Sequence, residues 1–264
     1  MNTHWLRGKS VAIVGASSVL GRNLIYYLVT VYDCKVMAID EDTTELKKLE
    51  KVDLLKSNIS LYSFNTSSPK SWQSFATELG DVGIDILINC KYSLSKFSNF
   101  HKEPVASIVK SINTNYLTSI YSIRYFFPFL KKSRTPTILN IACPLSLCVN
   151  KGASSYVANI DALKKLTEML SREYEEIYIS WCVLRGVRVE LYKQQEEDLE
   201  KKLDSCARPI GNMAIRIVEG LSKRRKKIIL GKHAKLLEIC LNYFPKTTKY
   251  VAKKFAEHRH IKTI

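Results

Sequence analysis

The sequence predicts an α/β protein built on a doubly wound, mostly parallel sheet. Short apolar runs of strand-like composition alternate along the chain with segments whose apolar residues recur at helical spacing. Two strands separated by a helix pair in parallel, because the helix carries the chain across one face of the sheet. A glycine-containing turn follows the first apolar run, as expected where a buried strand enters a helix. In such sheets, ligands bind beyond the carboxyl ends of the strands.

Each element is expected from its own pattern. Runs rich in β-branched and other apolar residues predict strands at 10–14, 35–39, 60–64, 84–89, 137–142, 179–184 and 227–230. Apolar residues at helical spacing predict helices at 20–31, 43–50, 69–79, 104–131, 156–176 and 210–223. The chain has 264 residues, 46% of them hydrophobic, and no repeat or Pro/Gly-rich linker divides it. We expect one domain over 1–230 and a basic helical extension over 231–264.

The turn after the first strand is a candidate phosphate-binding loop. Its residues are Gly15, Ala16, Ser17, Ser18, Val19, Leu20 and Gly21. The glycines permit a tight turn, which would point backbone N–H groups and the positive end of a helix toward a pyrophosphate. Taken alone, the same pattern also fits a plain strand–turn–helix corner.

Asp40 ends the next predicted strand, about 20 residues beyond the turn, where a carboxylate can hold the ribose hydroxyls of adenosine. Glu41 and Asp42 follow it with no arginine nearby, so a 2′-phosphate would be repelled. NAD is therefore the predicted cofactor, and NADP is not expected. No metal site is expected, because the seven cysteines lack C-x-x-C spacing. Buried thiols of this kind indicate a reducing intracellular compartment, either the cytoplasm or an organelle matrix.

Four further segments match the motifs of one family in order and spacing. They are 85–92, 114–118, 138–143 and 156–167. With the glycine turn, they make the chain resemble a divergent member of the classical short-chain dehydrogenase/reductase family, whose fold is Rossmann-like. The resemblance implies that the turn binds the cofactor together with Asp40, Asn65, Asn89 and Gly186. It also implies an active site with Asn115, Tyr156, Cys143 at the family's serine position and Ile160 at its lysine position.

The departures from the family's motifs bear on catalysis. The family's lysine lowers the pKa of the tyrosine by proximity of charge and holds the nicotinamide ribose, and Ile160 can do neither. Cys143 is a weak hydrogen-bond donor in place of the serine that orients the substrate. Val19 puts a branched side chain where a glycine of the family's loop lets the backbone approach the pyrophosphate.

Two hypotheses for the function follow. The first is a catalytically impaired pseudoenzyme that keeps the fold as a scaffold, a complex subunit or an NAD-sensing module, with NAD binding weak or lost. The alternative is an NAD-dependent oxidoreductase with an atypical active site that acts on a carbonyl or a secondary alcohol. A substitute for the lysine would favour the alternative. Lys164 lies too far along the helix from Tyr156, whereas Lys151 and Arg188 lie in loops whose direction the sequence does not determine.

The positive charge is concentrated near the C-terminus. Residues 221–264 contain thirteen lysines and arginines against two acidic residues, and so carry +11 of the formal +16. This segment loosely resembles the C-terminal extension of membrane-associated hydroxysteroid-dehydrogenase-like proteins. It fits a solvated cap, an element that lies on an anionic membrane surface, or a docking surface for an acidic partner. Nucleic acid is not expected, because no RNA- or DNA-binding motif is present. Neither a spanning helix nor a signal peptide is expected.

The predicted helices 104–131 and 156–176 are expected to form an interface, in a homo-oligomer or a hetero-complex. In the family, these helices commonly associate across twofold axes. The first carries six aromatic residues, more than one internal face readily buries, and an exposed apolar patch marks an interface. The six are Tyr116, Tyr121, Tyr125, Phe126, Phe127 and Phe129.

Overall fold

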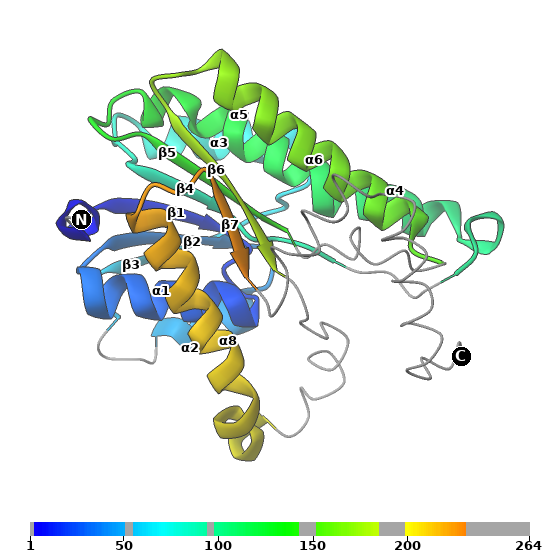
Figure 1. Cartoon of the computed structure of the whole chain (residues 1–264), viewed down its shortest axis with the longest axis horizontal. Coiled ribbons are helices and arrows are strands. Elements are labelled where there is room, and N and C mark those ends of the chain that lie inside the picture. Colours follow the sequence, from blue (N-terminus) through cyan, green and yellow to red (C-terminus); the bar gives the residue numbers. More distant parts are fainter. Residues whose placement is uncertain (1–2, 51–54, 94–97, 143–151, 185–198, 231–264) are drawn as a thin grey trace.

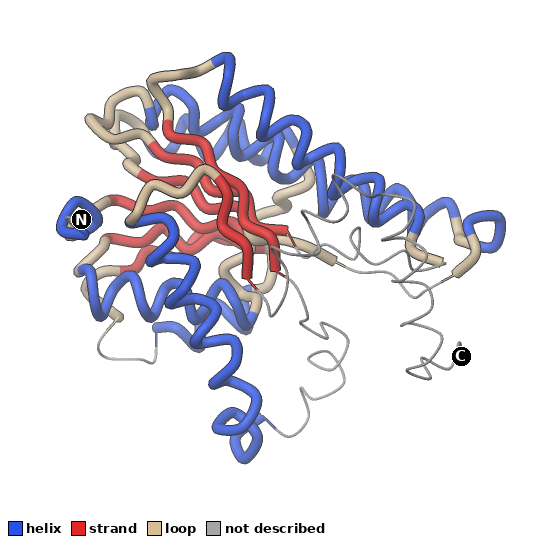
Figure 2. The backbone as a smooth tube through the Cα atoms, in the orientation of Figure 1, coloured by secondary structure: helices blue, strands red, loops and turns tan. Residues whose placement is uncertain are grey.

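The computed structural model describes residues 3–50, 55–93, 98–142, 152–184 and 199–230, which form one seven-stranded sheet with helices on both faces (Figures 1 and 2). The strands are β1 (Ser10–Val14), β2 (Lys35–Asp40), β3 (Ile59–Ser63), β4 (Ile86–Asn89), β5 (Thr137–Ala142), β6 (Tyr178–Leu184) and β7 (Lys227–Leu230). Their order is β3-β2-β1-β4-β5-β6-β7, and every neighbouring pair is parallel. The strand order reverses between β1 and β4, the point where such sheets bind ligands. The predicted fold class is confirmed.

Two layers of helices cover the sheet. They are α1 (Val19–Tyr32), α2 (Thr43–Glu50), α3 (Pro69–Leu79), α4 (Val105–Ile112), α5 (Thr118–Leu130), α6 (Ser154–Glu173) and α8 (Leu199–Ser222). In Figure 1, α1, α2 and α8 lie on one face, and α3, α5 and α6 lie on the other. Each face buries its own apolar cluster, which includes Leu24 and Leu221 on the first face and Trp72 and Phe126 on the second. Burial of these two clusters holds the helices on the sheet.

The structure differs from the sequence prediction mainly at residues 104–131. The segment is helical without a break, but it consists of α4, a π-helical turn at Asn113–Leu117 and α5, with helical backbone dihedral angles at both junctions. The Thr118 hydroxyl supports the wider turn by donating a hydrogen bond to the carbonyl oxygen of Asn113 at 3.0 Å. Turns of this kind often occur at functional sites. α8 begins at Leu199, earlier than the predicted start at residue 210, so Pro209 lies inside the helix.

The aromatic residues of 104–131 do not form the exposed patch that the sequence suggested. Each of the six is buried or half-buried, because the sheet and the neighbouring helices α3 and α6 cover more of this helix than one face. The exposed large apolar residues on these helices are Val105 and Val109 of α4 and Met169 of α6. Association through the two helices stays a prediction, which light scattering can test, but its aromatic basis is wrong.

Three of the cysteines can be placed. Cys34, Cys90 and Cys182 are buried free thiols, and burial raises the pKa of Cys90 to about 12. They are therefore protonated at neutral pH. Within the described part of the chain, no helix is both long and apolar enough to cross a membrane. The predicted extension over 231–264 lies outside that part.

Gly21 lies in the first turn of α1, where there is no room for a side chain. A Cβ at this position would collide with the carbonyl oxygen of Gly15 and lie 2.9 Å from the Cα of Ala16. The variant Gly21→Ala should therefore lower the free energy of unfolding by about 1–3 kcal/mol, the usual cost of overpacking. Chemical denaturation would measure the loss.

Gly211→Ala is the matched control, because Gly211 also lies in a helix. Outside its own helix, its Cβ would meet Asn23 Oδ1 at the ordinary contact distance of 3.6 Å. Since alanine favours helix over glycine, this variant should be neutral or more stable by up to about 1 kcal/mol. Equal effects of the two substitutions would contradict the steric account of Gly21.

Candidate functional site

The glycine turn joins β1 to α1 at the point where the strand order reverses. Gly15 has a φ of +93°, and a Cβ there would lie 2.6 Å from the backbone nitrogen of Lys91. Ser18 caps α1, because its Oγ accepts a hydrogen bond from the backbone N–H of Gly21 at 3.0 Å. The turn therefore has the strand–turn–helix geometry that its two glycines predict.

Val19 and Leu20 begin α1 and pack toward the core. Leu20 is buried, and half-buried Val19 packs against the same apolar cluster under α1. Core packing thus accounts for both side chains. That Val19 also hinders the approach of a pyrophosphate stays a prediction.

Asp40 ends β2, and the chain itself engages both of its carboxylate oxygens. Oδ2 accepts hydrogen bonds from the backbone N–H of Ser17, at 3.0 Å, and from the Ser17 hydroxyl. Oδ1 accepts one from the backbone N–H of Glu41, at 2.8 Å, and lies 3.1 Å from the Lys91 ammonium. A carboxylate offers about four acceptor positions, so these four donors fill it.

Lys91 is a site residue that the sequence did not single out. It follows β4, and its Nζ lies 3.1 Å from Glu41 Oε1 and 2.8 Å from Thr66 Oγ1. Thr66, just beyond β3, also donates to Glu41 Oε1 from its backbone N–H and its hydroxyl, at 2.9 and 2.8 Å. One ammonium thus joins the carboxyl ends of β2, β3 and β4, where the ribose of adenosine was expected. The sequence could have pointed to Lys91, because this lysine aligns with the alanine of the family's Asn-Asn-Ala-Gly segment.

The charge of Lys91 changes the titration of its neighbour. Burial would raise the pKa of Glu41, but the positive charge of Lys91 and the hydrogen bonds from Thr66 outweigh burial and hold the pKa below its ordinary value of 4.5. Glu41 is therefore ionised at neutral pH. Because its side chain is 44% exposed, solvent screening weakens its pairing with Lys91.

Asn65 and Asn89 both make hydrogen bonds within the fold. Asn65 is exposed, and its Oδ1 accepts a hydrogen bond from the backbone N–H of Ser67 at 2.9 Å, in the turn before α3. Asn89 is buried, its Nδ2 donates to Asn140 Oδ1 at 2.9 Å, and its Oδ1 accepts from Ser122 Oγ at 2.6 Å. Asn89 therefore ties β4 to β5 and α5. Contacts from either asparagine to a cofactor stay predictions.

Asn115 lies in the π-helical turn and is buried. Its Oδ1 accepts a hydrogen bond from the backbone N–H of Ser93 at 2.7 Å, and its Nδ2 donates to the Ser93 carbonyl at 2.9 Å and to Ser111 Oγ at 3.0 Å. Ser111 Oγ also accepts from Asn159 Nδ2 of α6, at 3.1 Å. Both amide hydrogens of Asn115 are thus used in holding the segment after β4 against α4, which leaves neither to donate to a relay water.

Tyr156 and Ile160 lie about one turn apart on α6. Both residues are only 2% exposed and belong to an apolar cluster with Leu163, Trp181 and Val183. Ile160 therefore packs against β6 at the position where the family has a charged lysine. An apolar side chain therefore stands at this position in place of a charged one.

The described lysines of α6 are Lys164 and Lys165, eight and nine residues beyond Tyr156. Lys165 is largely exposed and lies 3.5 Å from Glu168. Burial, and to a smaller extent the charge of Lys164, lowers the pKa of Lys227 at the start of β7. Four further positions of the predicted site lie outside the described residues, namely Cys143, Lys151, Gly186 and Arg188.

Comparisons with known proteins cover most of the chain. The family model of short chain dehydrogenases matches residues 9–217. The chain is similar to a 3-ketodihydrosphingosine reductase of Dictyostelium discoideum, with 23% identity over 235 residues that cover 81% of this chain and 70% of that protein.

Solved structures agree in fold at low sequence identity. The apo form of LigD from Sphingobium sp. strain SYK-6 has a TM-score of 0.73 and 16% identity, and the match covers 92% of this chain and 98% of that one. A putative short-chain dehydrogenase from Novosphingobium aromaticivorans has a TM-score of 0.73 and 18% identity, over 96% of this chain and 98% of that one. These matches establish a shared architecture.

The pairing of Lys91 with Glu41 predicts a pH-dependent contribution to stability. Since the pKa of Glu41 is lower in the folded state, the pair stabilises the fold above the ordinary glutamate pKa, and this contribution is lost as pH falls through the lower folded value. The variant Lys91→Gln should raise the pKa of Glu41, as measured by NMR titration. The stability difference from the wild type should shrink below about pH 4.

Lys132→Gln is the control, because Lys132 pairs with the exposed Asp81. It should leave the titration of Glu41 unchanged. An unchanged pKa of Glu41 in Lys91→Gln would show that the ion pair does not hold in solution.

Proposed function

Because this chain belongs to the short-chain dehydrogenase family, we propose that it is a catalytically impaired member that serves as a scaffold, a complex subunit or an NAD-sensing module. The observation that carries this proposal is the pairing of Lys91 with Asp40 and Glu41. The packing of Ile160 beside Tyr156 supports it independently.

The residues present fit a dinucleotide only in part. The turn from Gly15 to Gly21 retains the backbone geometry that would face a pyrophosphate. A ribose bound at Asp40 must donate its hydroxyls to acceptor positions that Ser17, Glu41 and Lys91 now fill. Of these donors, only the Lys91 ammonium and the Ser17 hydroxyl can leave without breaking the backbone of the turn, and a ribose that engages both carboxylate oxygens must displace both. Dinucleotide binding therefore requires the ion pair to open, which lowers the affinity.

Lys91 also bears on the choice between NAD and NADP. The acidic sequence after Asp40 favours NAD, but Lys91 brings a cation to the same edge of the sheet. Its ammonium is already neutralised by two carboxylates, so a 2′-phosphate gains little from it. We retain NAD, bound weakly, as the proposed ligand.

Replacement of the family's lysine by Ile160 accounts for impaired catalysis in this proposal. The bound nicotinamide would supply or accept a hydride, and the chain must then move a proton at the tyrosine oxygen. Ile160 provides no positive charge to favour the tyrosinate. Positioned acid–base catalysis is typically worth about 10²–10⁴-fold in rate. The rate should therefore fall by several orders of magnitude.

An active NAD-dependent oxidoreductase is the second candidate. It would act on a carbonyl or a secondary alcohol. The observation that favours it is the similarity to a protein described as a 3-ketodihydrosphingosine reductase, at 23% identity. Tyr156 is also retained on α6.

The first test concerns cofactor affinity. Lys91→Ala places the family's residue at the end of β4 and frees acceptor positions on Asp40 and Glu41, so NADH should bind roughly tenfold more tightly than to the wild type. Isothermal titration calorimetry would measure both affinities, with Lys132→Ala as a control that leaves them unchanged. Submicromolar binding to the wild type, or weaker binding to Lys91→Ala, would overturn the proposed role of Lys91.

The second test restores the chemistry. Combining Ile160→Lys, Cys143→Ser and Val19→Gly in the Lys91→Ala background should yield measurable NADH-linked reduction of a generic diketone or quinone. Adding Tyr156→Phe should abolish the recovered rate, and circular dichroism would confirm that each variant folds. If the wild type already reduces such substrates and Tyr156→Phe stops it, the chain is an enzyme and the impaired-catalysis proposal is wrong.

A further inference from the structure

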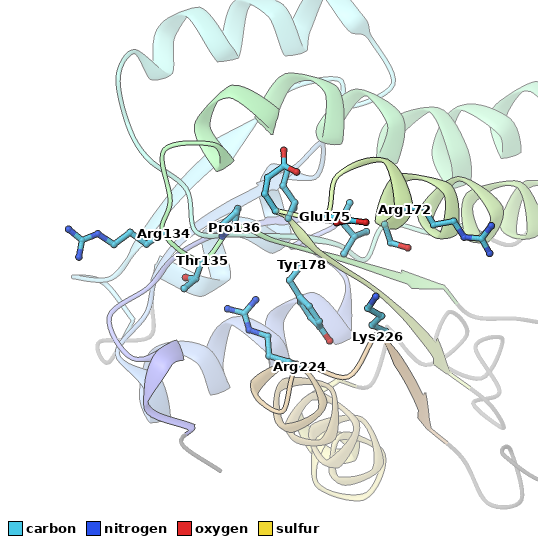
Figure 3. Close-up of a pocket in the computed structure, with 12 residues that line it drawn as sticks. Arg134, Thr135, Pro136, Arg172, Glu175, Tyr178, Arg224 and Lys226 are labelled. Atoms are coloured by element: carbon cyan, nitrogen blue, oxygen red, sulfur yellow. The ribbon is translucent and has the colours of Figure 1, made fainter.

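A polar cavity lies at the amino ends of β5 and β6, at the opposite end of the strands from the glycine turn. Its volume is about 600 Å³, within the range of small-molecule sites. Figure 3 shows Arg224, Tyr178 and Lys226 close together in this cavity, with Thr135 beside them. These residues come from the loop before β7, the start of β6 and the segment before β5.

Arg224 is held in place by aromatic rings. Its Cζ lies 4.1 Å from the centre of the Trp5 ring and 5.0 Å from the centre of the Tyr178 ring. One guanidinium nitrogen donates a weak hydrogen bond to Thr137 Oγ1 at 3.4 Å. Among the described residues, no carboxylate forms an ion pair with Arg224. Burial lowers the pKa of Arg224 from its usual value, because the cation is partly removed from water without a counter-charge.

Two hydroxyls in the same cavity also have no partner. The phenolic oxygen of Tyr178 and Oγ1 of Thr135 are buried and make no hydrogen bond. Burial raises the pKa of Tyr178, so its hydroxyl keeps its proton and can donate. An unsatisfied buried hydroxyl costs free energy. A ligand with acceptor oxygens would recover it once the side chains that cover the two oxygens move, since both oxygens are shielded from solvent in this structure.

The charges around the cavity favour an anion. Four cations line it against two glutamates, Glu175 and Glu176. In Figure 3 the side chains of Arg134 and Arg172 extend outward at its two sides, so they contribute at longer range than Arg224. Arg224, Tyr178, Thr135 and Lys226 each bring a hydrogen-bond donor to the lining, which suits a ligand that accepts hydrogen bonds.

We propose that this cavity binds the phosphate group of a small ligand, with Arg224, Tyr178 and Thr135 donating to its oxygens and Lys226 adding charge. A planar guanidinium presents several N–H donors in the geometry that phosphate oxygens require. The aromatic contacts fix the direction of this fork before the ligand arrives, which reduces the entropy lost on binding. The proposal does not depend on the carboxyl edge or on Lys91, because none of those residues lines the cavity.

Titration with inorganic phosphate and glycerol 3-phosphate, at constant ionic strength set with chloride, tests the proposal in the full chain. Calorimetry should detect binding to the wild type, and Arg224→Gln should weaken it at least about tenfold, the effect of losing a charge-assisted hydrogen bond. Arg225→Gln is the matched control, because Arg225 is exposed and does not line the cavity. It should bind like the wild type.

Tyr178→Phe separates binding from folding. It removes only a hydroxyl that has no partner in the structure, so the melting temperature without phosphate should not fall. Phosphate should raise the melting temperature of the wild type but raise that of Tyr178→Phe less. An equal increase in both, the absence of any phosphate effect beyond that of chloride, or an equal loss of affinity in Arg224→Gln and Arg225→Gln would overturn the proposal.

Vesicles distinguish a lipid headgroup from a free phosphate ester. Flotation with phosphatidylcholine vesicles that contain phosphatidic acid, if lost in Arg224→Gln and Tyr178→Phe, would identify the lipid as the source of the phosphate. Binding of glycerol 3-phosphate without such flotation would identify a soluble ligand. Flotation that is equal in all variants, together with no binding of either soluble phosphate, would also overturn the proposal.

Discussion

The close contact between the glycine turn and the end of β4 sets the geometry of the carboxyl edge. With a φ of +93° and no side chain, Gly15 lies against the backbone of Cys90 and Lys91. This contact brings the residue after β4 beside the end of β2, so that a long side chain there reaches Asp40. The same feature that admits a pyrophosphate in a dinucleotide-binding turn thus also lets Lys91 occupy the neighbouring position.

Polar side chains buried near this edge form hydrogen bonds that hold the helices on the sheet. Ser122, Asn89, Asn140 and Thr167 form a continuous series of hydrogen bonds from α5 across β4 and β5 to α6. Such a network must be fully paired to be tolerated in the core, and this pairing fixes how the two helices sit on the sheet. It lets the architecture persist even where the residues of the active site change.

The central strands were predictable because each, such as β1 and β4, is a short apolar run whose burial on both faces demands that composition. The edge strand β3 is only partly buried. The π-helical turn within residues 104–131 was not predictable, since such a turn leaves the apolar periodicity almost unchanged. Gly15, Asp40 and Ile160 were identified because motif spacing places them. Lys91 and Arg224 were not, because their importance arises from side chains that meet across elements distant in the sequence. The exposed aromatic patch was wrongly expected because helix periodicity alone does not say how many neighbours cover a helix.

An ammonium tethered to the chain competes with a ligand in a particular way. A short tether holds it at an effective concentration in the millimolar range, and dilution of the protein does not change that value. A dinucleotide would then meet only the fraction of molecules in which Lys91 has turned away from Asp40 and Glu41, and its apparent affinity falls by that fraction. A change that moves Lys91 away from the two carboxylates would therefore lower the dinucleotide concentration needed to occupy the site.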